Sequence, residues 1–460
     1  MSGTAIKRRT ELAAKHPLDF TLQYPPRRAY FQENFRENVA LEEARKESEV
    51  LLYAHVPFCQ SKCYFCNFAV DIRANPDLHQ RYTDLLCAQI TRIHEFLPES
   101  TRVPGIDIGG GTPTLLQAEQ LAQILAAMKP WKERATTNAP LSIETTPRIA
   151  GTCPDRLQAL FEGGVTRISM GVQSANAATL AAVNRQEQID MTGKAVENMR
   201  KTGFSRINAD IIFGLPNQSE ADWKQSVEQV IALGVDSVTT YDCLYRGKGR
   251  ALTKRTPDKP TPEHYGRLYD LSYAMLKDAG YHAPYGSVNF SKHPRESGTS
   301  PYFEARLFDH IPYLGAGNYS SSMFGDYWWF APYGVNEWMK NIEDGEILPQ
   351  GDAYLLPQRE LMVKQVLLSL NFGTISESRF EKRFGVTLQD VYAREIEYGQ
   401  ERGWLRRIEG GYGVSPGHFR HMPQIRSLFY TEDAITWLLD GAYAQTQAQA
   451  GGKAVAVAAR

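Results

Sequence analysis

The sequence predicts an α/β fold built on a parallel sheet, either a partial barrel or a doubly wound sheet. Apolar segments of strand length alternate with segments of helical periodicity from residue 51 to about residue 280. Six such strand–helix units follow one another. Strands that alternate with amphipathic helices pair in parallel through right-handed crossovers. Six units are fewer than the eight of a closed barrel, which leaves both arrangements open.

The strand–helix units can be placed one by one. The first strand, LLYAHVP, covers residues 51–57 and runs into a loop with three cysteines. Apolar residues then recur at helical spacing over 76–97. Later strands are expected at 105–110, 141–145, 165–172, 206–215 and 236–242. Later helices are expected near 117–129, 154–162, 176–202, 218–233 and 262–280.

The segments on either side of these units differ in composition, which predicts five parts of the chain. Short helices followed by a hairpin in residues 351–430 are typical of a mainly helical, winged-helix-like domain. Trp328, Trp329 and Phe330 could stack on a flat substrate or simply belong to a core. The predicted parts are an N-terminal extension (1–50), the α/β domain (51–290), an aromatic and Gly-rich segment that covers the site (291–350), the C-terminal domain (351–430) and a low-complexity tail (431–460).

Charge and hydropathy exclude several classes of partner. The chain carries 51 Lys and Arg against 52 Asp and Glu, so no basic excess favours nucleic acid or an anionic membrane surface. Its longest apolar stretches are of strand length, well short of the roughly 20 residues that span a bilayer. The N-terminus has no apolar stretch of the kind found in secretory signals. We therefore expect no nucleic-acid partner, no membrane partner and no secretion.

Three of the six cysteines, Cys59, Cys63 and Cys66, lie in the loop after the first strand. Three thiolates on a cubane [4Fe–4S] cluster leave one iron free to bind a substrate or cofactor, and the end of a strand is where α/β sheets place their sites. Zinc is the first alternative, and it needs a fourth ligand, for which His55 is the nearest candidate. The second alternative is that the cysteines are merely buried. The spacing favours the open cluster.

The spacing C-x3-C-x2-C, with an aromatic residue before the last cysteine, resembles the radical S-adenosylmethionine (SAM) superfamily. YAHVPFCQSKCYFC looks like the opening of oxygen-independent coproporphyrinogen III oxidase and its relatives. Further motifs of that family follow in its order over roughly residues 50 to 430: GGGTPT (109–114), SIETTP (142–147), RISMGVQS (167–174), VNRQ (183–186), NADIIFGLP (208–216) and LGAGNYSSSMFGD (314–326).

The resemblance implies an incomplete (β/α)6 barrel that holds the cluster on Cys59, Cys63 and Cys66 and two SAM molecules. Tyr53, Gly110 and Glu144 match the contacts of one SAM, and Tyr53 and Glu144 are also assigned the catalytic role. Ser321 falls where the family has an apolar ligand contact. The residues that match the contacts of the second SAM are Phe65, Gly111, Thr112, Gln173, Arg185 and Asp210. A small aromatic natural product or tetrapyrrole as substrate, an electron donor such as flavodoxin or ferredoxin, and a cytoplasmic location are also implied.

One departure from the family pattern bears on the reaction. The oxidases have a further cysteine two positions after the third, whereas Phe68 stands there in this chain. The pattern is similar to that of the class C radical SAM methylases, and we expect transfer of a SAM-derived methyl or methylene group to an sp² carbon, as methylation or cyclopropanation. The alternatives are oxidative decarboxylation, as in coproporphyrinogen III dehydrogenase, and a heme chaperone without catalysis.

Overall fold

The computed structural model describes residues 3–15, 24–25, 30–31, 37–138, 141–185, 189–245, 252, 256 and 259–436. Its centre is an 11-stranded sheet in the order β11-β10-β9-β8-β1-β2-β3-β4-β5-β6-β7. The strands β1 to β6 pair in parallel and in chain order, so the sheet is not doubly wound. The six are β1 (Leu51–Val56), β2 (Ile106–Gly110), β3 (Leu141–Thr145), β4 (Arg167–Gln173), β5 (Arg206–Phe213) and β6 (Ser237–Asp242).

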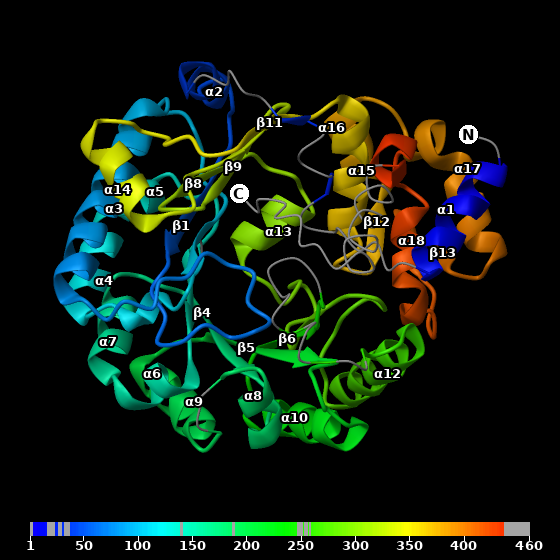
Figure 1. Ribbon diagram of the computed structural model, residues 1–460, viewed down its shortest axis with the longest axis horizontal. Helices are drawn as coiled ribbons and strands as arrows, with labels where there is room; N and C mark the ends of the chain where they lie inside the picture. The colour runs from blue at the N-terminus through cyan, green and yellow to red at the C-terminus, as the bar shows by residue number, and fades with distance from the viewer. Residues whose placement is uncertain are drawn as a thin grey trace, which may run out of the picture.

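Helices cover one face of this curved sheet, as Figure 1 shows, and α13 (Pro301–Leu307) lies on the opposite, inner face against β1, β2 and β3. The first covering helix, α3 (Pro76–Phe96), begins where the Asn75 side chain accepts hydrogen bonds from two backbone N–H groups and Pro76 takes the first helical position. The others are α4 (Ala118–Ala127), α5 (Lys129–Glu133), α6 (Pro147–Thr152), α7 (Pro154–Glu162), α8 (Ala177–Ala182), α9 (Met191–Thr202), α10 (Glu220–Ala232) and α12 (Pro262–Asp278).

The sheet continues beyond the six predicted strands on both sides. On one side β7 (Asn289–Ser291) pairs antiparallel with β6. On the other side β8 pairs parallel with β1, and three antiparallel strands follow. These four are β8 (Tyr313–Ala316), β9 (Ser321–Phe324), β10 (Tyr327–Phe330) and β11 (Ala353–Leu355), and α14 (Val335–Glu343) lies between β10 and β11. The aromatic segment therefore extends the sheet, and sequence analysis missed these strands because Gly and Pro hide their short apolar runs.

Trp328 and Trp329 belong to the core. Each is only 2% exposed, and the Lys364 ammonium lies 3.8 Å from the centre of a Trp328 ring. Of the two possibilities left open by the sequence, the structure favours the core role for these two residues.

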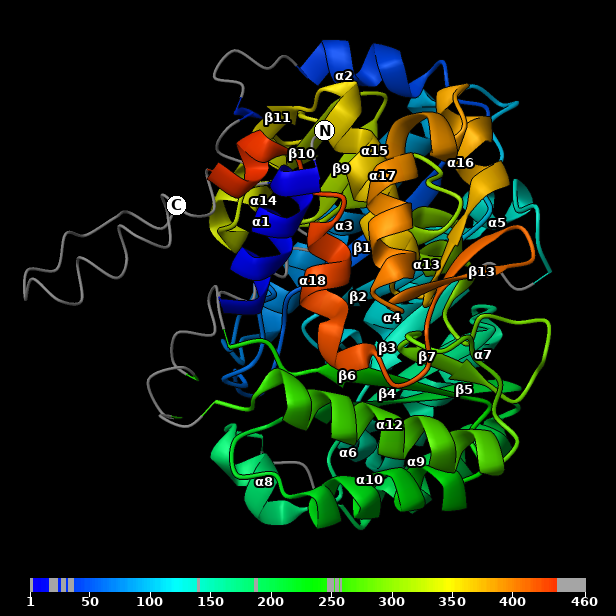
Figure 2. The same cartoon turned by 90° about the vertical axis from the view of Figure 1, so that its right-hand side faces the viewer.

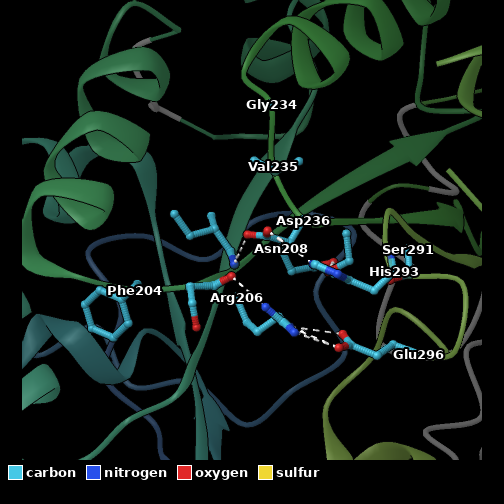
Figure 3. Close-up of polar contacts among 12 residues, drawn as sticks. Phe204, Arg206, Asn208, Gly234, Val235, Asp236, Ser291, His293 and Glu296 are labelled. Carbon is cyan, nitrogen blue, oxygen red and sulfur yellow. Dashed lines mark hydrogen bonds and ion pairs between the residues drawn. The ribbon is translucent and has the colours of Figure 1, made fainter. Parts of the chain in front are cut away.

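The rim at the amino ends of β5 and β6 is held by ion pairs (Figure 3). Arg206, at the start of β5, donates to Glu296 through Nη2 at 2.8 Å and through Nε at 3.1 and 3.2 Å. Asp236, just before β6, accepts from the Arg200 guanidinium at 2.6 Å and from the Ile207 backbone N–H at 2.8 Å. These contacts fasten the loop after β7 to the base of the parallel strands.

The C-terminal part combines helices with a three-stranded antiparallel sheet of order β12-β14-β13. Figure 2 shows α1 (Gly3–Lys15) beside α18 (Met422–Ser427), so the two ends of the described chain lie together. The N-terminal helix α2 (Glu37–Ala44) lies near β9. The remaining elements are α15 (Gln358–Ser369), β12 (Thr374–Ser376), α16 (Glu377–Phe384), α17 (Leu388–Glu401), β13 (Leu405–Ile408) and β14 (Gly411–Val414).

No helix in the described residues is long and apolar enough to cross a membrane. The predicted tail lies outside the described residues from position 437 onward.

Candidate active site

The cysteine loop starts at the carboxyl end of β1 and is closed by its own backbone. Asp71 N–H donates to the carbonyl of Pro57 at 2.8 Å, and Cys59 N–H donates to the carbonyl of Asp71 at 2.9 Å. The loop is also attached to the segment after α8, since Tyr64 N–H donates to the carbonyl of Val183 at 2.9 Å. Backbone contacts at both ends therefore present the three thiols in one place.

The three thiols are half-buried and free of disulfides. Burial raises the pKa of Cys59 to about 11, and burial also raises the pKa of Cys66, with the other cysteines contributing to both shifts. No group of three or more His, Cys, Asp or Glu side chains in the described part of the chain is placed to hold a single metal ion. A cluster spreads its ligands over several irons, so its cysteines lie farther apart than the ligands of one zinc ion.

The glycine motif after β2 lies directly against the cysteine loop. The backbone N–H groups of Gly111 and Thr112 donate to the carbonyls of Val56 and Phe58, each at 2.8 Å. A Cβ on Gly111 would lie 2.5 Å from the Pro57 oxygen, and Gly110 has a φ of +120° beside the His55 ring. Glycine is therefore required here for close packing of two loops.

His55, the candidate fourth zinc ligand, is a satisfied core residue. Its Nε2 lies 3.0 Å from the carbonyl oxygen of Ala69, and its Nδ1 lies 3.3 Å from the Tyr53 hydroxyl. Burial lowers the pKa of His55 to about 4, so the ring is neutral. It orients Tyr53, which lies on the inner face of β1.

Glu144 lies near the carboxyl end of β3 and accepts a hydrogen bond from Gly110 N–H at 3.2 Å. Burial raises the pKa of Glu144 to about 8, and the nearby Asp210 and Asp107 carboxylates add to the shift. Tyr53 is within electrostatic range of Glu144. The structure thus brings together Tyr53, Gly110 and Glu144, the three residues predicted to contact one SAM.

Gln173 and Arg185 form a second group, next to the cysteine loop. Arg185 donates to the carbonyl of Gly171, and its Nη1 lies 3.8 Å from the sulfur of Cys63. The strand bulges between Gly171 and Gln173, and Gln173 has a φ of +68°. A non-glycine residue in this region is strained, and such strain collects at functional sites. The buried Gln173 Oε1 has no hydrogen-bond partner in the described structure, so a ligand could donate to it.

Asp210, in the middle of β5, is held by neutral donors. Ser169 Oγ and Asn208 Nδ2 donate to its two oxygens at 2.9 and 2.8 Å. Burial raises the pKa of Asp210 despite these contacts. The carboxylate faces the same side of the sheet as Glu144, and the pKa of each responds to a shared neighbour, Arg167.

The remaining predicted contacts have different surroundings. Thr112 Oγ1 lies 3.5 Å from the Cys59 sulfur. Phe65 packs in an apolar cluster with Val183, Ile212 and Leu215, beyond the carboxyl end of β5. Ser321 starts β9, which is separated from β1 by β8, and none of the contacts above involves it. The role of Ser321 stays a prediction.

Sequence reasoning missed three polar residues on the inner face: Asp107, Arg167 and Tyr241. Burial raises the pKa of Asp107 to about 7, and its Oδ1 has no hydrogen-bond partner in the described structure. Burial lowers the pKa of Arg167, which interacts electrostatically with Asp210 and Asp107. Single charged residues inside apolar strand segments such as GIDIGG and TRISMGV were the signal that could have revealed the first two.

Comparison with known proteins agrees with this geometry. Residues 53–230 match the model of the radical SAM superfamily. This stretch is a radical SAM domain. The oxygen-independent coproporphyrinogen III oxidase of Synechocystis sp. is 27% identical over 81% of this chain and 82% of its own length. The Escherichia coli protein of the same name is 26% identical over 80% and 82%.

Two further comparisons concern the fold and part of the sequence. The solved coproporphyrinogen III oxidase (HemN) from Escherichia coli superposes with a TM-score of 0.73 at 22% identity, over 88% of this chain and 96% of that one. "Radical S-adenosyl methionine domain-containing protein 1, mitochondrial" of Danio rerio is 30% identical over 53% of this chain and 54% of its own length. The prediction of a radical SAM enzyme is therefore confirmed, and so is its α/β fold.

The radical SAM match confirms the predicted cofactors, a [4Fe–4S] cluster and SAM. The residues present fit them, because the loop offers three thiols and the sheet offers carboxylates and an unpartnered amide oxygen beside it. Methyl transfer gains no support from these relatives, which are named as oxidases and match the decarboxylation alternative instead.

Proposed function

We propose that this chain oxidatively decarboxylates a propionate side chain of a tetrapyrrole of the coproporphyrinogen type. The observation that carries the proposal is the similarity to curated oxygen-independent coproporphyrinogen III oxidases over about four-fifths of both chains. This proposal reverses the order of our expectation from the sequence, in which methyl transfer came first and decarboxylation second. The two reactions share the cluster and the radical and differ in the carbon that loses hydrogen.

The cofactors supply the hard chemistry: the reduced cluster and SAM together generate a 5′-deoxyadenosyl radical. Cys59, Cys63 and Cys66 would hold the cluster. Glu144 would accept from the ammonium of one SAM, and Tyr53 would stand beside it. Arg185 and Asp210 would bind the carboxylate and ribose hydroxyls of a second SAM, with Gln173 as a further acceptor.

The atoms and electrons of the proposed reaction balance if an external acceptor takes up one electron. A hydrogen atom of the propionate β-carbon would pass to C5′ and give 5′-deoxyadenosine, the bond between the α-carbon and the carboxylate would break, and CO₂ and a vinyl group would form. One electron remains and passes to a one-electron acceptor. Residues of the inner face orient the propionate so that its β-hydrogen meets the radical, since proximity determines the rate of hydrogen transfer.

We also propose the finer points of the sequence analysis that bear on this function. The curved sheet would be an incomplete (β/α)6 barrel, and α15 to β14 a winged-helix-like accessory domain. Flavodoxin or ferredoxin would supply the electron for the cluster. The oxygen-labile cluster favours a cytoplasmic location.

Methyl transfer stays as the second candidate because of Phe68. It replaces the further cysteine of the oxidases, and its side chain is 53% exposed at the edge of the cysteine loop. The large exposed ring would change the approach to the cluster. The reaction would then begin with hydrogen abstraction from the methyl group of the second SAM.

Isotope labelling separates these reactions. The reconstituted protein would be incubated without oxygen with coproporphyrinogen III, a reductant and SAM that carries a deuterated methyl group. Unlabelled 5′-deoxyadenosine with CO₂ and a vinyl product supports decarboxylation. Deuterated 5′-deoxyadenosine with S-adenosylhomocysteine supports methyl transfer and overturns our first proposal. Heme binding without SAM cleavage by an intact cluster would contradict both reactions and favour the chaperone.

A further inference from the structure

Two arginines occupy equivalent places on neighbouring strands but differ in their partners. Arg167 on β4 and Arg206 on β5 are register partners, so their Cα atoms lie side by side at the same level of the sheet. Arg206 is neutralised at the rim by Glu296, with its closest contact at 2.8 Å (Figure 3). Arg167 donates to Ser142 Oγ and to the carbonyl of Gly298, both at 3.3 Å. Within the described residues, Arg167 contacts neutral oxygens and no carboxylate.

Carboxylates surround Arg167 at longer range. Asp210, Asp107 and Glu144 all interact with its charge electrostatically, and none of them comes within ion-pair distance. Asp107 instead accepts from Ser300 Oγ at 2.8 Å, and Asp210 accepts from Ser169 and Asn208. The carboxylates are thus held by their own donors, and the guanidinium keeps donors free for another acceptor.

The inner face around Arg167 is partly exposed. Tyr241 shares the inner face of β6 with Ser237 and Thr239, both of which hydrogen-bond to Asn208. Tyr241 is within electrostatic range of Arg167 and Asp210, yet 44% of its surface is exposed. The exposed Tyr241 shows that the described protein does not fully cover the inner face at the end of β6. Arg167 itself is half-buried rather than sealed.

We propose that Arg167 binds a carboxylate of the substrate on the inner face of the sheet. A half-buried guanidinium with a planar fork of N–H donors suits a carboxylate, because two parallel hydrogen bonds form at once. The Asp107 oxygen that lacks a partner offers a nearby acceptor for an N–H group of the same ligand. A pyrrole that bears a carboxylate side chain provides both groups. The substrate identity rests on the proposed function, whereas the carboxylate site rests on Arg167 alone.

Binding of a matched pair of porphyrins tests the inference. The reconstituted protein is titrated with coproporphyrin III, which has free carboxylates, and with its tetramethyl ester, which has none. We expect the wild type to prefer the acid and Arg167→Gln to lose about ten- to hundredfold in affinity for the acid alone. Arg206→Gln is the matched control, since it removes the same charge from the neighbouring strand and should keep the preference. Arg167→Lys keeps the charge without the fork and should fall between.

The outcomes separate the inference from the proposed function. If Arg167→Gln keeps the preference for the acid, our assignment is wrong, although tetrapyrrole binding stands. If the wild type binds neither porphyrin, the proposed substrate class fails, and propionate then becomes the probe in saturation-transfer NMR. A propionate signal lost only in Arg167→Gln would support the carboxylate site, and no signal in the wild type would overturn it. Iron content and melting temperature of each variant distinguish loss of binding from loss of folding.

Discussion

Two regions of this molecule bury charged and polar groups. The regions differ in whether those groups have close hydrogen-bond partners. The first region, which we call the terminal clamp, joins Arg9, Tyr24 and Tyr30 of the N-terminal segment to Glu360 and Glu395 of the C-terminal part. Glu360 is fully buried and accepts from the hydroxyls of Tyr24 at 2.5 Å and Tyr30 at 2.7 Å. Arg9 pairs with Glu395 at 3.3 Å. Both carboxylates of the clamp have close donors.

The second region is the inner face of the sheet, where polar atoms are left open. Asp107 Oδ1 and Gln173 Oε1 are buried without a hydrogen-bond partner in the described structure. Burial raises the pKa of Glu144 to about 8 and that of Asp107 to about 7. Buried polar groups with partners hold a fold together, whereas open ones cost stability and are candidates for contacts with a ligand. The clamp therefore maintains structure, and we expect the inner face to bind ligands.

The largest expected effect comes from the cysteine loop. Cys63→Ala removes one of three thiolates, so the cluster should be lost and reductive SAM cleavage abolished. Iron analysis and quantification of 5′-deoxyadenosine measure this. Cys87→Ala, in the partly buried face of α3, is the control and should keep both. A Cys63→Ala protein with full iron and full SAM cleavage would contradict the cluster assignment.

The clamp should show the reverse pattern. Glu360→Ala leaves the hydroxyls of Tyr24, Tyr30 and Thr431 without their acceptor. We expect a loss of about 3–5 kcal/mol in the free energy of unfolding, which urea titration would measure. The iron content of the folded fraction should not change. Glu401→Ala, on the exposed end of α17, should cost less than about 0.5 kcal/mol. Equal losses of unfolding free energy in both variants would show that the clamp does not stabilise the fold more than an exposed glutamate does.

Glu144→Gln should separate stability from function on the inner face. The pKa of Glu144 is raised from 4.5 to about 8 in the folded protein. Between these values the folded state holds a proton that the unfolded state releases, so stability of the cofactor-free protein falls as pH rises. Gln cannot ionise and can still accept from Gly110. We expect Glu144→Gln to be more stable than the wild type at pH 8.5, by on the order of 1–3 kcal/mol, and to bind SAM less tightly.

Thermal unfolding from pH 5 to 8.5, with and without SAM, tests this expectation. The gain should be absent at pH 5, where the wild-type carboxyl is already protonated in the folded state. A variant that is destabilised at every pH would mean that the carboxylate stabilises the fold, as Glu360 does.

The sequence allowed prediction of the parts whose signals are local. Alternating apolar strands and amphipathic helices indicated the six parallel strands, and each lies close to its predicted range. The cysteine spacing predicted where the cluster site lies, because three thiols in one loop need no tertiary information. The strand β8 escaped prediction because its parallel neighbour β1 lies more than 250 residues earlier, whereas β9 and β10 form a local hairpin whose short apolar runs the surrounding Gly and Pro hid.

The open polar groups were harder to foresee for the same reason. Arg167 looks like any charged residue at the start of a strand, and its register partner Arg206 looks the same. Only the placement of Glu296, from the loop after β7, distinguishes the two. Similarly, nothing local marks Tyr24 as a partner of Glu360, which is 336 positions away. Partners brought together by the fold decide which buried charge is structural and which binds a ligand.

Asp107→Asn should give the smallest change in stability of these four variants. The pKa of Asp107 is raised from 3.8 to about 7, a shift similar to that of Glu144, and the nearby Arg167 guanidinium offsets part of the cost of its charge. Asn has a carbonyl oxygen that can still accept from Ser300, and removal of the charge should raise stability by about 1 kcal/mol at pH 8.5 and by nothing near pH 4. Asp155→Asn, on the exposed first turn of α7, controls for the change in net charge. Stability measured against pH would contradict this expectation if Asp107→Asn weakened the fold at high pH. In that event Asp107 would resemble the carboxylates of the clamp, and its open oxygen would not mark a ligand site.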